Sequence, residues 1–341
     1  MFKRYIKELK DFIKEEYKFI ICLFSLYIIC IYPVNYYIII GGGISDIDSR
    51  VQVENEYKSK GSFNISYVTQ IEGRIATYLL SYIITDWKRV KISDYKYIEE
   101  DEIEDINFRS ELDLKNANST AIKWAYTLAE KDYEITDTKI YVILSYPEYK
   151  SPLKVGDEIL SINNHSFKTL TEYQEYIQTL DINNKVSIEL KRNNETKIIN
   201  CKLHRYEDRL ILGVALQVVN EYKVNPAVEF HFKKNESGPS GGLITTLSIY
   251  DKLTKEDLTA NLKIAGTGTI EEDGTIGEIG EVKYKLLGAI SDEADIFLVP
   301  NGQNYKDCIA LKKERNLDIK IIGVSTIEEA IEQIKRVNSK K

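Results

Sequence analysis

Ser237-Gly238-Pro239-Ser240-Gly241-Gly242-Leu243 is the stretch that sets the architecture of the C-terminal part of this chain. Gly and Pro favour a tight turn here, and the residues from Gly242 to Leu253 then follow with the apolar spacing of a helix. Strand-like and helix-like stretches alternate from 206 to 338, which is typical of an α/β domain. The sequence therefore predicts a domain over 206–338 in which Ser240 stands immediately before a helix.

Ser240 lies in a Gly-x-Ser-x-Gly pattern, which is typical of a catalytic serine that a downstream histidine deprotonates. The chain has three histidines, His165, His204 and His231, and all of them precede Ser240. A catalytic histidine that precedes the serine is the other arrangement. That order is typical of β-barrel proteases, and the alternation of strands and helices argues against a β-barrel. An ordinary turn before a helix is the non-catalytic alternative.

A lysine can replace histidine as the base when burial lowers its pKa. We predict that Lys283 has this role, because it opens a helix and heads an apolar stripe. The residues of that stripe are Leu286, Leu287 and Ile290. Lys285 lies about 200° around the helix axis from Lys283 and is expected to face solvent. A lysine whose stem merely covers apolar surface is the alternative.

Composition excludes several other classes of function. The 341 residues carry 46 Lys and Arg against 53 Asp and Glu, a net charge of −7, which argues against a nucleic-acid-binding protein. Cys201-x-x-His204 has no second pair to complete a zinc site, and the four cysteines form no Cys-x-x-Cys. No Walker sequence occurs. We therefore expect no metal, no cofactor and no ATP-driven unfolding by this chain.

The N-terminal part predicts a membrane anchor over residues 19–40, which contain no charged residue. Six Lys and Arg stand in residues 1–18 and three in residues 41–60. This bias predicts a cytoplasmic N-terminus and places everything after the anchor outside the cytoplasm. A cleaved signal peptide is one alternative, although no Ala-x-Ala-like site follows the apolar run, and a buried core helix is the other. Residues 41–135 have no assigned role.

Residues 136–205 predict a compact β-rich module with a helix after Thr169. Leu153-Lys-Val-Gly-Asp-Glu-Ile-Leu-Ser-Ile-Asn163 resembles the signature of PDZ domains. The resemblance implies that an extended peptide, commonly a C-terminus, adds as a strand. Ile140, Tyr141 and Val142, with the helix over 171–180, would line its groove. A β-rich spacer that binds nothing is the alternative.

Residues 237–243 (SGPSGGL), 266–270 (GTGTI) and 277–289 (GEIGEVKYKLLGA) resemble the proteolytic domain of Lon-type serine–lysine peptidases. In that family the lysine follows the serine by 43 residues, and here 283 − 240 = 43. Together with the anchor and the PDZ-like module, the chain resembles membrane-anchored, PDZ-containing Lon-like proteases, which makes it a multidomain α+β protein.

The resemblance implies that Ser240 is the nucleophile, that Lys283 is the base and that Thr267 holds the lysine. Backbone amides at Gly238 and Gly241 would support the oxyanion. Glu281 replaces a glycine of the family pattern, and its carboxylate raises the pKa of the nearby lysine. The expected function is an ATP-independent endopeptidase that cleaves unfolded, membrane or secreted proteins, and a homo-oligomer is compatible with it. A catalytically silent, membrane-tethered PDZ adaptor is the alternative.

Overall fold

The computed structural model describes residues 2–339, which fall into two compact units. One unit comprises Met1–Gly41 and Val68–Tyr95, and the other comprises Gly42–Tyr67 and Lys96–Lys341. Strands β1 and β3 each have residues in both units. The smaller unit holds, wholly or in part, α1 (Phe2–Ile31), β1 (Pro33–Asp46), β3 (Ser62–Arg74), α2 (Ile75–Leu80), β4 (Lys88–Lys91) and the 3₁₀ turn η2 (Ile92–Tyr95).

The N-terminal helix of the smaller unit ends before the predicted anchor does. Helix α1 ends at Ile31, and β1 begins at Pro33. Proline lacks an amide hydrogen and disfavours helical backbone at the residue before it, so the helix stops here. The apolar residues that follow pair with β4, from Tyr36 opposite Lys91 to Ile39 opposite Lys88. The expected helical anchor over 19–40 is therefore wrong as one element.

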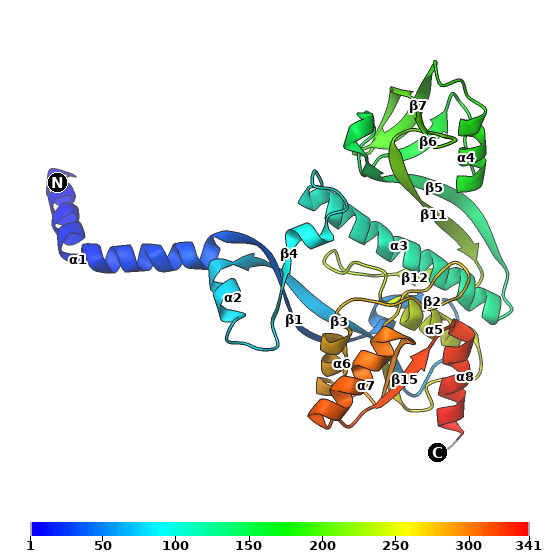
Figure 1. Cartoon of the computed structure of the whole chain (residues 1–341). Coiled ribbons are helices and arrows are strands. Elements are labelled where there is room, and N and C mark those ends of the chain that lie inside the picture. Colours follow the sequence, from blue (N-terminus) through cyan, green and yellow to red (C-terminus); the bar gives the residue numbers. More distant parts are fainter. Residues whose placement is uncertain (1, 340–341) are drawn as a thin grey trace. The chain divides into compact units, whose positions relative to one another are not determined.

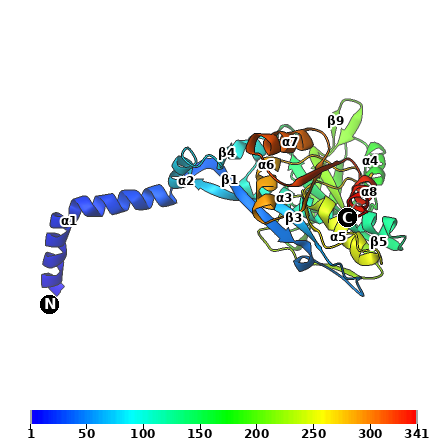
Figure 2. The ribbon, with the colours of Figure 1, turned by 90° about the horizontal axis from the view of Figure 1, so that it is seen from below.

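The second half of that apolar run is instead a buried strand. Ile38 and Ile39 are fully buried, which explains their apolar character without lipid. The first half, residues 19–31, lies in α1, and Figures 1 and 2 show α1 extending away from α2 and β4 of its own unit. Over the stretch 2–339, no helix combines the length and the apolarity that crossing a bilayer requires.

The larger unit contains a five-stranded antiparallel sheet in the order β11-β5-β6-β7-β8. Its own core includes Ile140, Val142 and Leu190. The elements of this part, with the long helix that precedes it, are α3 (Ile103–Leu128), β5 (Tyr133–Ser145), η3 (Pro147–Tyr149), β6 (Glu158–Ile162), α4 (Leu170–Gln178), β7 (Lys185–Arg192), β8 (Glu195–Lys202), β9 (His204–Tyr206), β10 (Arg209–Ile211) and β11 (Val214–Val224). The sheet therefore includes β11, which lies beyond residue 205, the predicted end of the β-rich module.

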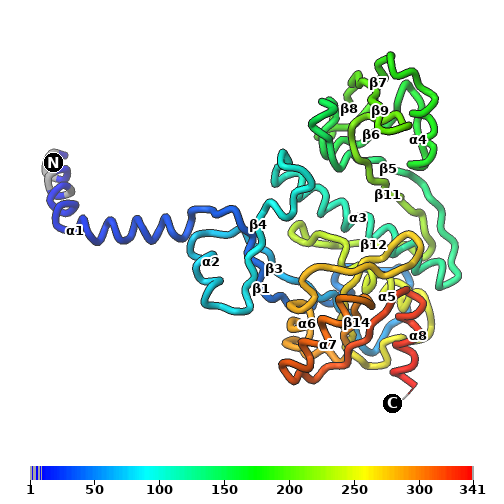
Figure 3. The backbone as a smooth tube through the Cα atoms, viewed as in Figure 1, coloured from blue at the N-terminus to red at the C-terminus, as the bar shows by residue number. Residues whose placement is uncertain are grey.

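The C-terminal part of the larger unit is a layered α/β arrangement on parallel strands ordered β15-β14-β13-β3. The elements outside the five-stranded sheet are η1 (Ile47–Ser49), β2 (Val51–Val53), β12 (Val228–Phe230), α5 (Gly242–Leu253), β13 (Lys263–Gly266), α6 (Val282–Ser291), β14 (Ile296–Pro300), α7 (Gln303–Arg315), β15 (Lys320–Val324) and α8 (Ile327–Asn338). Figure 3 shows α5 beside α8, and α6 beside α7.

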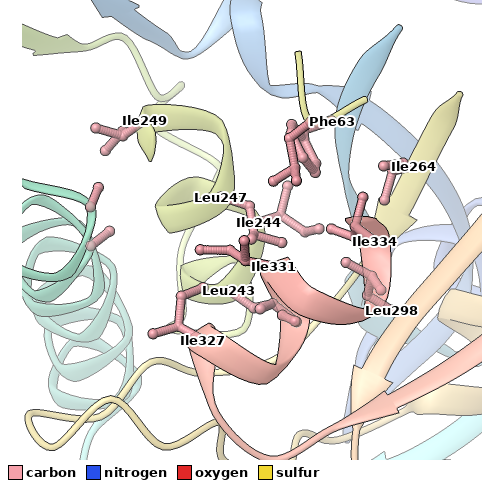
Figure 4. Packing of buried hydrophobic residues seen from close by; sticks show 14 of the residues in the cluster. Phe63, Leu243, Ile244, Leu247, Ile249, Ile264, Leu298, Ile327, Ile331 and Ile334 are labelled. Atoms are coloured by element: carbon pink, nitrogen blue, oxygen red, sulfur yellow. The ribbon is translucent and has the colours of Figure 1, made fainter. Parts of the chain in front are cut away.

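Alternation along the strands places one helix pair on each face of this sheet. On β14, Leu298 belongs to the same core as Leu247 of α5 and Ile331 of α8, as Figure 4 shows. The next residue, Val299, packs with Leu286 of α6 in a separate core. Successive strand residues point to opposite faces, so the parallel sheet is buried on both sides. The site described next lies where α5 and α6 begin.

Candidate active site

Ser240 sits in a tight turn that leads into α5. Gly238 has φ +85°, in the left-handed region that favours glycine, and its amide donates to the Ser110 carbonyl of α3 at 2.8 Å. The Gly242 amide donates to the Pro239 carbonyl at 3.1 Å. The turn thus presents Ser240 at the N-terminal end of α5, where the helix dipole is positive. Because its amide is bonded to Ser110, Gly238 supports the turn rather than an oxyanion.

The Ser240 hydroxyl meets a lysine from α6. Lys285 Nζ donates to Ser240 Oγ at 2.8 Å and to Thr267 Oγ1 at 3.1 Å. The Lys285 side chain is only 5% exposed. Burial disfavours the ammonium and lowers the pKa of Lys285 to about 8, against a smaller raising effect of the Glu281 carboxylate. A substantial neutral fraction at pH 8 is what a general base for a serine requires.

The lysine at this site is not the one that the sequence predicted. Lys283 is exposed, whereas Lys285 is buried. The buried face of α6 runs through Val282, Lys285, Leu286 and Ala289, which are spaced i, i+3, i+4 and i+7 from Val282. Of the predicted face, Leu286 is buried and Leu287 and Ile290 are partly buried, but Lys283 at its start is exposed. The lysine at Ser240 follows it by 45 residues, since 285 − 240 = 45, and the 43-residue spacing selected the wrong residue.

Thr267 connects the Lys285 amine to the Ser240 backbone. This fully buried residue follows β13, and its hydroxyl donates to the Ser240 carbonyl at 3.0 Å while accepting from Lys285 Nζ. The next amide, Gly268, also donates to the Ser240 carbonyl, at 2.8 Å. The sequence expected Thr267 to hold a lysine, and the structure places it against Lys285. These bonds fix the Ser240 backbone, and the Thr267 hydroxyl directs a lone pair toward the Lys285 amine.

Ser66 is a residue of the site that sequence reasoning missed. It lies on β3, is fully buried, and its hydroxyl donates to the Lys285 carbonyl at 2.6 Å. β3 mixes polar and apolar residues, so nothing in its sequence marked this serine as buried, and a buried hydroxyl needs a partner. The sequence could not identify the partner, which is 219 positions away. Ser66 thus holds the backbone that carries the lysine.

Two residues that depart from the family pattern lie at the helix starts. Glu281 is the N-cap of α6 and has φ +61°, a left-handed conformation that a glycine adopts without strain. Gly241 precedes α5 and has ordinary helical φ and ψ. A Cβ at Gly241 would lie 2.9 Å from Ile65 Cδ1, the movable end of a side chain. The positive φ at position 281 explains why a glycine is favoured there. At position 241 the backbone is helical, and nothing in the structure requires a glycine.

The residues predicted to bind a peptide do not form a sheet edge. Ile140 pairs with Val218 of β11 on one side and with Ile159 of β6 on the other. Val142 is also paired with β11, and both Ile140 and Val142 are buried. A strand that is paired on both sides has no free backbone groups with which to bind an incoming peptide strand. The prediction that Ile140, Tyr141 and Val142 line the peptide-binding groove is therefore wrong. The edges of this sheet are β11 and β8.

Strand β11 is the edge that lies next to the predicted helix. The Gln178 side chain at the end of α4 donates to the Leu210 carbonyl at 2.9 Å and accepts from the Leu210 amide at 2.8 Å. Leu210 belongs to β10, four residues before β11 begins. Farther along β11, Ser119 of α3 donates to the Asn220 carbonyl at 2.7 Å. The part of β11 near Val214 and Leu216 is therefore the candidate peptide-binding edge.

Comparison with known proteins identifies both parts of the larger unit. A PDZ domain family model matches residues 114–203, and the Lon protease (S16) C-terminal proteolytic domain matches residues 229–336. The chain is 34% identical over 97 residues to a Lon protease of Xanthomonas oryzae pv. oryzae, covering 28% of this chain and 11% of that protein. A Lon protease of Neorickettsia sennetsu is 35% identical over 97 residues, with the same coverage.

These matches are confined to parts of the chain. The chain spans about a tenth of the length of those Lon proteases. The PDZ domain of an SdrC-like protein from Listeria monocytogenes is 24% identical, covering 24% of this chain and 92% of that one, with a TM-score of 0.22. The PDZ model overlaps the predicted module at 136–205 but begins at residue 114, and the Lon model lies within the predicted 206–338. The chain therefore carries a PDZ domain and a Lon protease (S16) C-terminal proteolytic domain.

Proposed function

We propose that this protein is an ATP-independent serine endopeptidase in which Ser240 is the nucleophile and Lys285 is the general base. The observation that carries the proposal is the 2.8 Å hydrogen bond between Lys285 Nζ and Ser240 Oγ. The buried environment that lowers the lysine pKa to about 8 supports it. A serine paired with a neutral amine is a recognised way to activate a hydroxyl.

In the proposed reaction, Ser240 Oγ attacks a peptide carbonyl while Lys285 accepts the hydroxyl proton. The lysine then gives that proton to the leaving amine, and an acyl-enzyme remains on Ser240. A water molecule, deprotonated by the same amine, releases the acyl group. Amides at the start of α5 are the proposed oxyanion donors, with help from the helix dipole. General acid–base transfer of this kind contributes about 10²–10⁴-fold in rate.

The proposed activity is tested with the full chain and an unfolded polypeptide substrate, without nucleotide. We expect cleavage by the parent protein and none by Ser240→Ala. Ser93→Ala, in the exposed part of η2, is the matched control and should cleave at the parental rate. Cleavage by Ser240→Ala at the parental rate would contradict the proposal. No cleavage by the parent would favour the alternative, a catalytically silent PDZ adaptor.

We also propose that the PDZ domain binds peptide C-termini along β11 and delivers or gates substrate. Strand addition supplies main-chain hydrogen bonds, and β11 has an unpaired side near α4. A labelled peptide with a free C-terminus should bind the full chain, and its amidated form should bind more weakly. Leu216→Asp should weaken binding, whereas Ile198→Asp on the opposite edge strand β8 should not. Equal effects of the two variants would contradict this placement.

Finally, we propose that the protein contacts a bilayer through residues 19–31 of α1. The support is an uncharged helical segment whose large apolar side chains are exposed, preceded by six Lys and Arg in residues 1–18. Substrates would then be unfolded membrane or secreted proteins. Flotation of the full chain with phospholipid vesicles tests the contact, and a protein that stays at the bottom of the gradient would contradict it.

A further inference from the structure

The turn after α2 exposes a group of large apolar side chains that no site above uses. Five of the six residues from 79 to 84 are large, apolar and exposed. Their exposed fractions are 54% for Leu79, 43% for Leu80, 62% for Tyr82, 77% for Ile83 and 37% for Ile84. We call residues 79–84 the apolar turn. Soluble proteins rarely expose a contiguous group of this kind unless it contacts a partner or a membrane.

The apolar turn is a built structure. The amides of Ile83 and Ile84 both donate to the Leu80 carbonyl at 2.9 Å. Arg89 of β4 donates to the Ser81 carbonyl at 2.8 Å, and its guanidinium lies 3.8 Å from the centre of the Tyr82 ring. Backbone and side-chain bonds therefore hold the apolar tips outward, so their exposure does not come from a loose segment.

Two other contacts connect the start of α2, the helix that leads into the apolar turn, to the end of α1. The Ile75 amide at the start of α2 donates to the Tyr32 carbonyl at 3.2 Å, and the Arg74 guanidinium donates to the Ile31 carbonyl at 2.6 Å. All these residues belong to the smaller unit. The turn is thus fixed beside the helix whose residues 19–31 are uncharged and exposed.

The residues around the apolar turn have the composition of a membrane interface. Tyr32 and Tyr82 are exposed, and the Tyr36 and Tyr78 rings lie 4.9 Å apart. Strand β4 follows with the sequence Lys88-Arg89-Val90-Lys91. Tyrosine rings concentrate where a bilayer meets water, and basic residues are attracted to anionic headgroups. A second copy of the chain would supply no comparable reason for this combination.

We infer that the apolar turn inserts into the interfacial region of an anionic phospholipid bilayer and forms a second lipid contact beside α1. This inference rests on the proposed contact of α1 with lipid. It gives residues 75–91 a role: a second point of contact restricts the depth and orientation of this unit at the bilayer, which one helix alone does not. The partner is the bilayer surface, and tyrosine, isoleucine and leucine side chains are the groups that enter it.

An environment-sensitive dye at position 83 of the full chain tests the inference. Cys22→Ser and Cys30→Ser remove the two exposed thiols, and Cys201 and Cys308 are buried. Ile83→Cys carries the dye, and Ile198→Cys on β8, where Ile198 is 71% exposed, is the matched control. Vesicles with anionic phospholipid and a shallow spin-labelled lipid provide the quencher. We expect a blue shift and quenching at position 83 and neither at position 198.

A second measurement uses Ile83→Asp, which replaces the most exposed residue of the turn and leaves the core intact. We expect a several-fold lower vesicle-bound fraction than for the control Ile198→Asp, with a larger difference on anionic than on zwitterionic vesicles. If the protein floats but position 83 behaves like position 198, this inference is overturned and the contact of α1 stands. If the protein does not float, both fail. A blue shift that needs no lipid and grows with protein concentration would assign the turn to a second copy.

Discussion

Lys285 Nζ and Ser240 Oγ lie 2.8 Å apart, although Lys285 belongs to α6 and Ser240 to the turn before α5. Burial removes the Lys285 amine from water, so its N–H groups need hydrogen-bond acceptors within the protein. Here two hydroxyls accept from it, one being the proposed nucleophile and the other Thr267, which in turn is bonded to the Ser240 carbonyl. The arrangement aligns an amine of lowered pKa with a hydroxyl at the positive end of a helix.

The pH dependence of cleavage should report the lysine. Because only the neutral amine accepts a proton, kcat/KM should rise with pH through the Lys285 pKa of about 8 and level off above it. Initial rates on a short fluorogenic peptide between pH 6 and 10 measure the profile. A profile that levels off near pH 6.5, where histidine titrates, would contradict a lysine base.

Replacing Glu281 should move that profile. Its carboxylate raises the Lys285 pKa, so Glu281→Gln should lower it further and shift the acid limb of kcat/KM to lower pH. Glu281→Gly should do the same and also stabilise the fold by about 1 kcal/mol, because it removes a left-handed glutamate. Chemical denaturation of the two variants separates the effects. An acid limb that moves to higher pH in Glu281→Gln would contradict the assignment.

The buried lysine should make stability depend on pH. Its folded pKa of about 8 lies below its ordinary value of 10.5, so the unfolded chain binds more protons between these values and the fold gains stability as pH rises through this window. The full gain is about 3 kcal/mol at about 1.4 kcal/mol per pKa unit. We expect Lys285→Met to lose this pH dependence in denaturant melts at pH 7.5 and 10. An identical dependence in both proteins would show that the amine is solvated.

Thr267 should act as a positioning residue. Thr267→Val removes the hydroxyl that accepts from Lys285 and should lower kcat about tenfold or more, while Thr267→Ser keeps it and should retain most activity. Loss of an acceptor disfavours the ammonium, so the acid limb of the Val variant should also move to lower pH. A purely structural role would reduce the amount of folded enzyme and leave that limb in place.

Much of the site was predictable from local sequence. Gly238 and Pro239 before an apolar helical run predict the turn that presents Ser240, and the structure has α5 over the residues expected. The absence of any histidine after His231 correctly directed attention to lysine. These inferences rest on glycine and proline geometry and on residue order, which do not depend on distant parts of the chain.

The choice between Lys283 and Lys285 was not predictable in the same way. Apolar or small residues occupy most positions of α6, so two candidate faces exist and the hydrophobic period does not separate them. Packing against β3 and β13 decides, through contacts such as the one between Ser66 and Lys285. A similar ambiguity misplaced residues 33–40, where a run of apolar residues fits both a lipid-facing helix and a buried strand. Sheet order likewise decided which PDZ strand is an edge.

The central claim, that Lys285 is the base for Ser240, is tested most directly by comparing Lys285→Met with Lys283→Met. The substitutions are chemically identical, lie two residues apart on one helix, and are measured as kcat/KM on the same peptide at pH 9, with folding checked by circular dichroism. We predict that Lys285→Met loses at least about 100-fold in kcat/KM and that Lys283→Met keeps the parental rate. Loss of activity in Lys283→Met, with Lys285→Met still active, would contradict the claim.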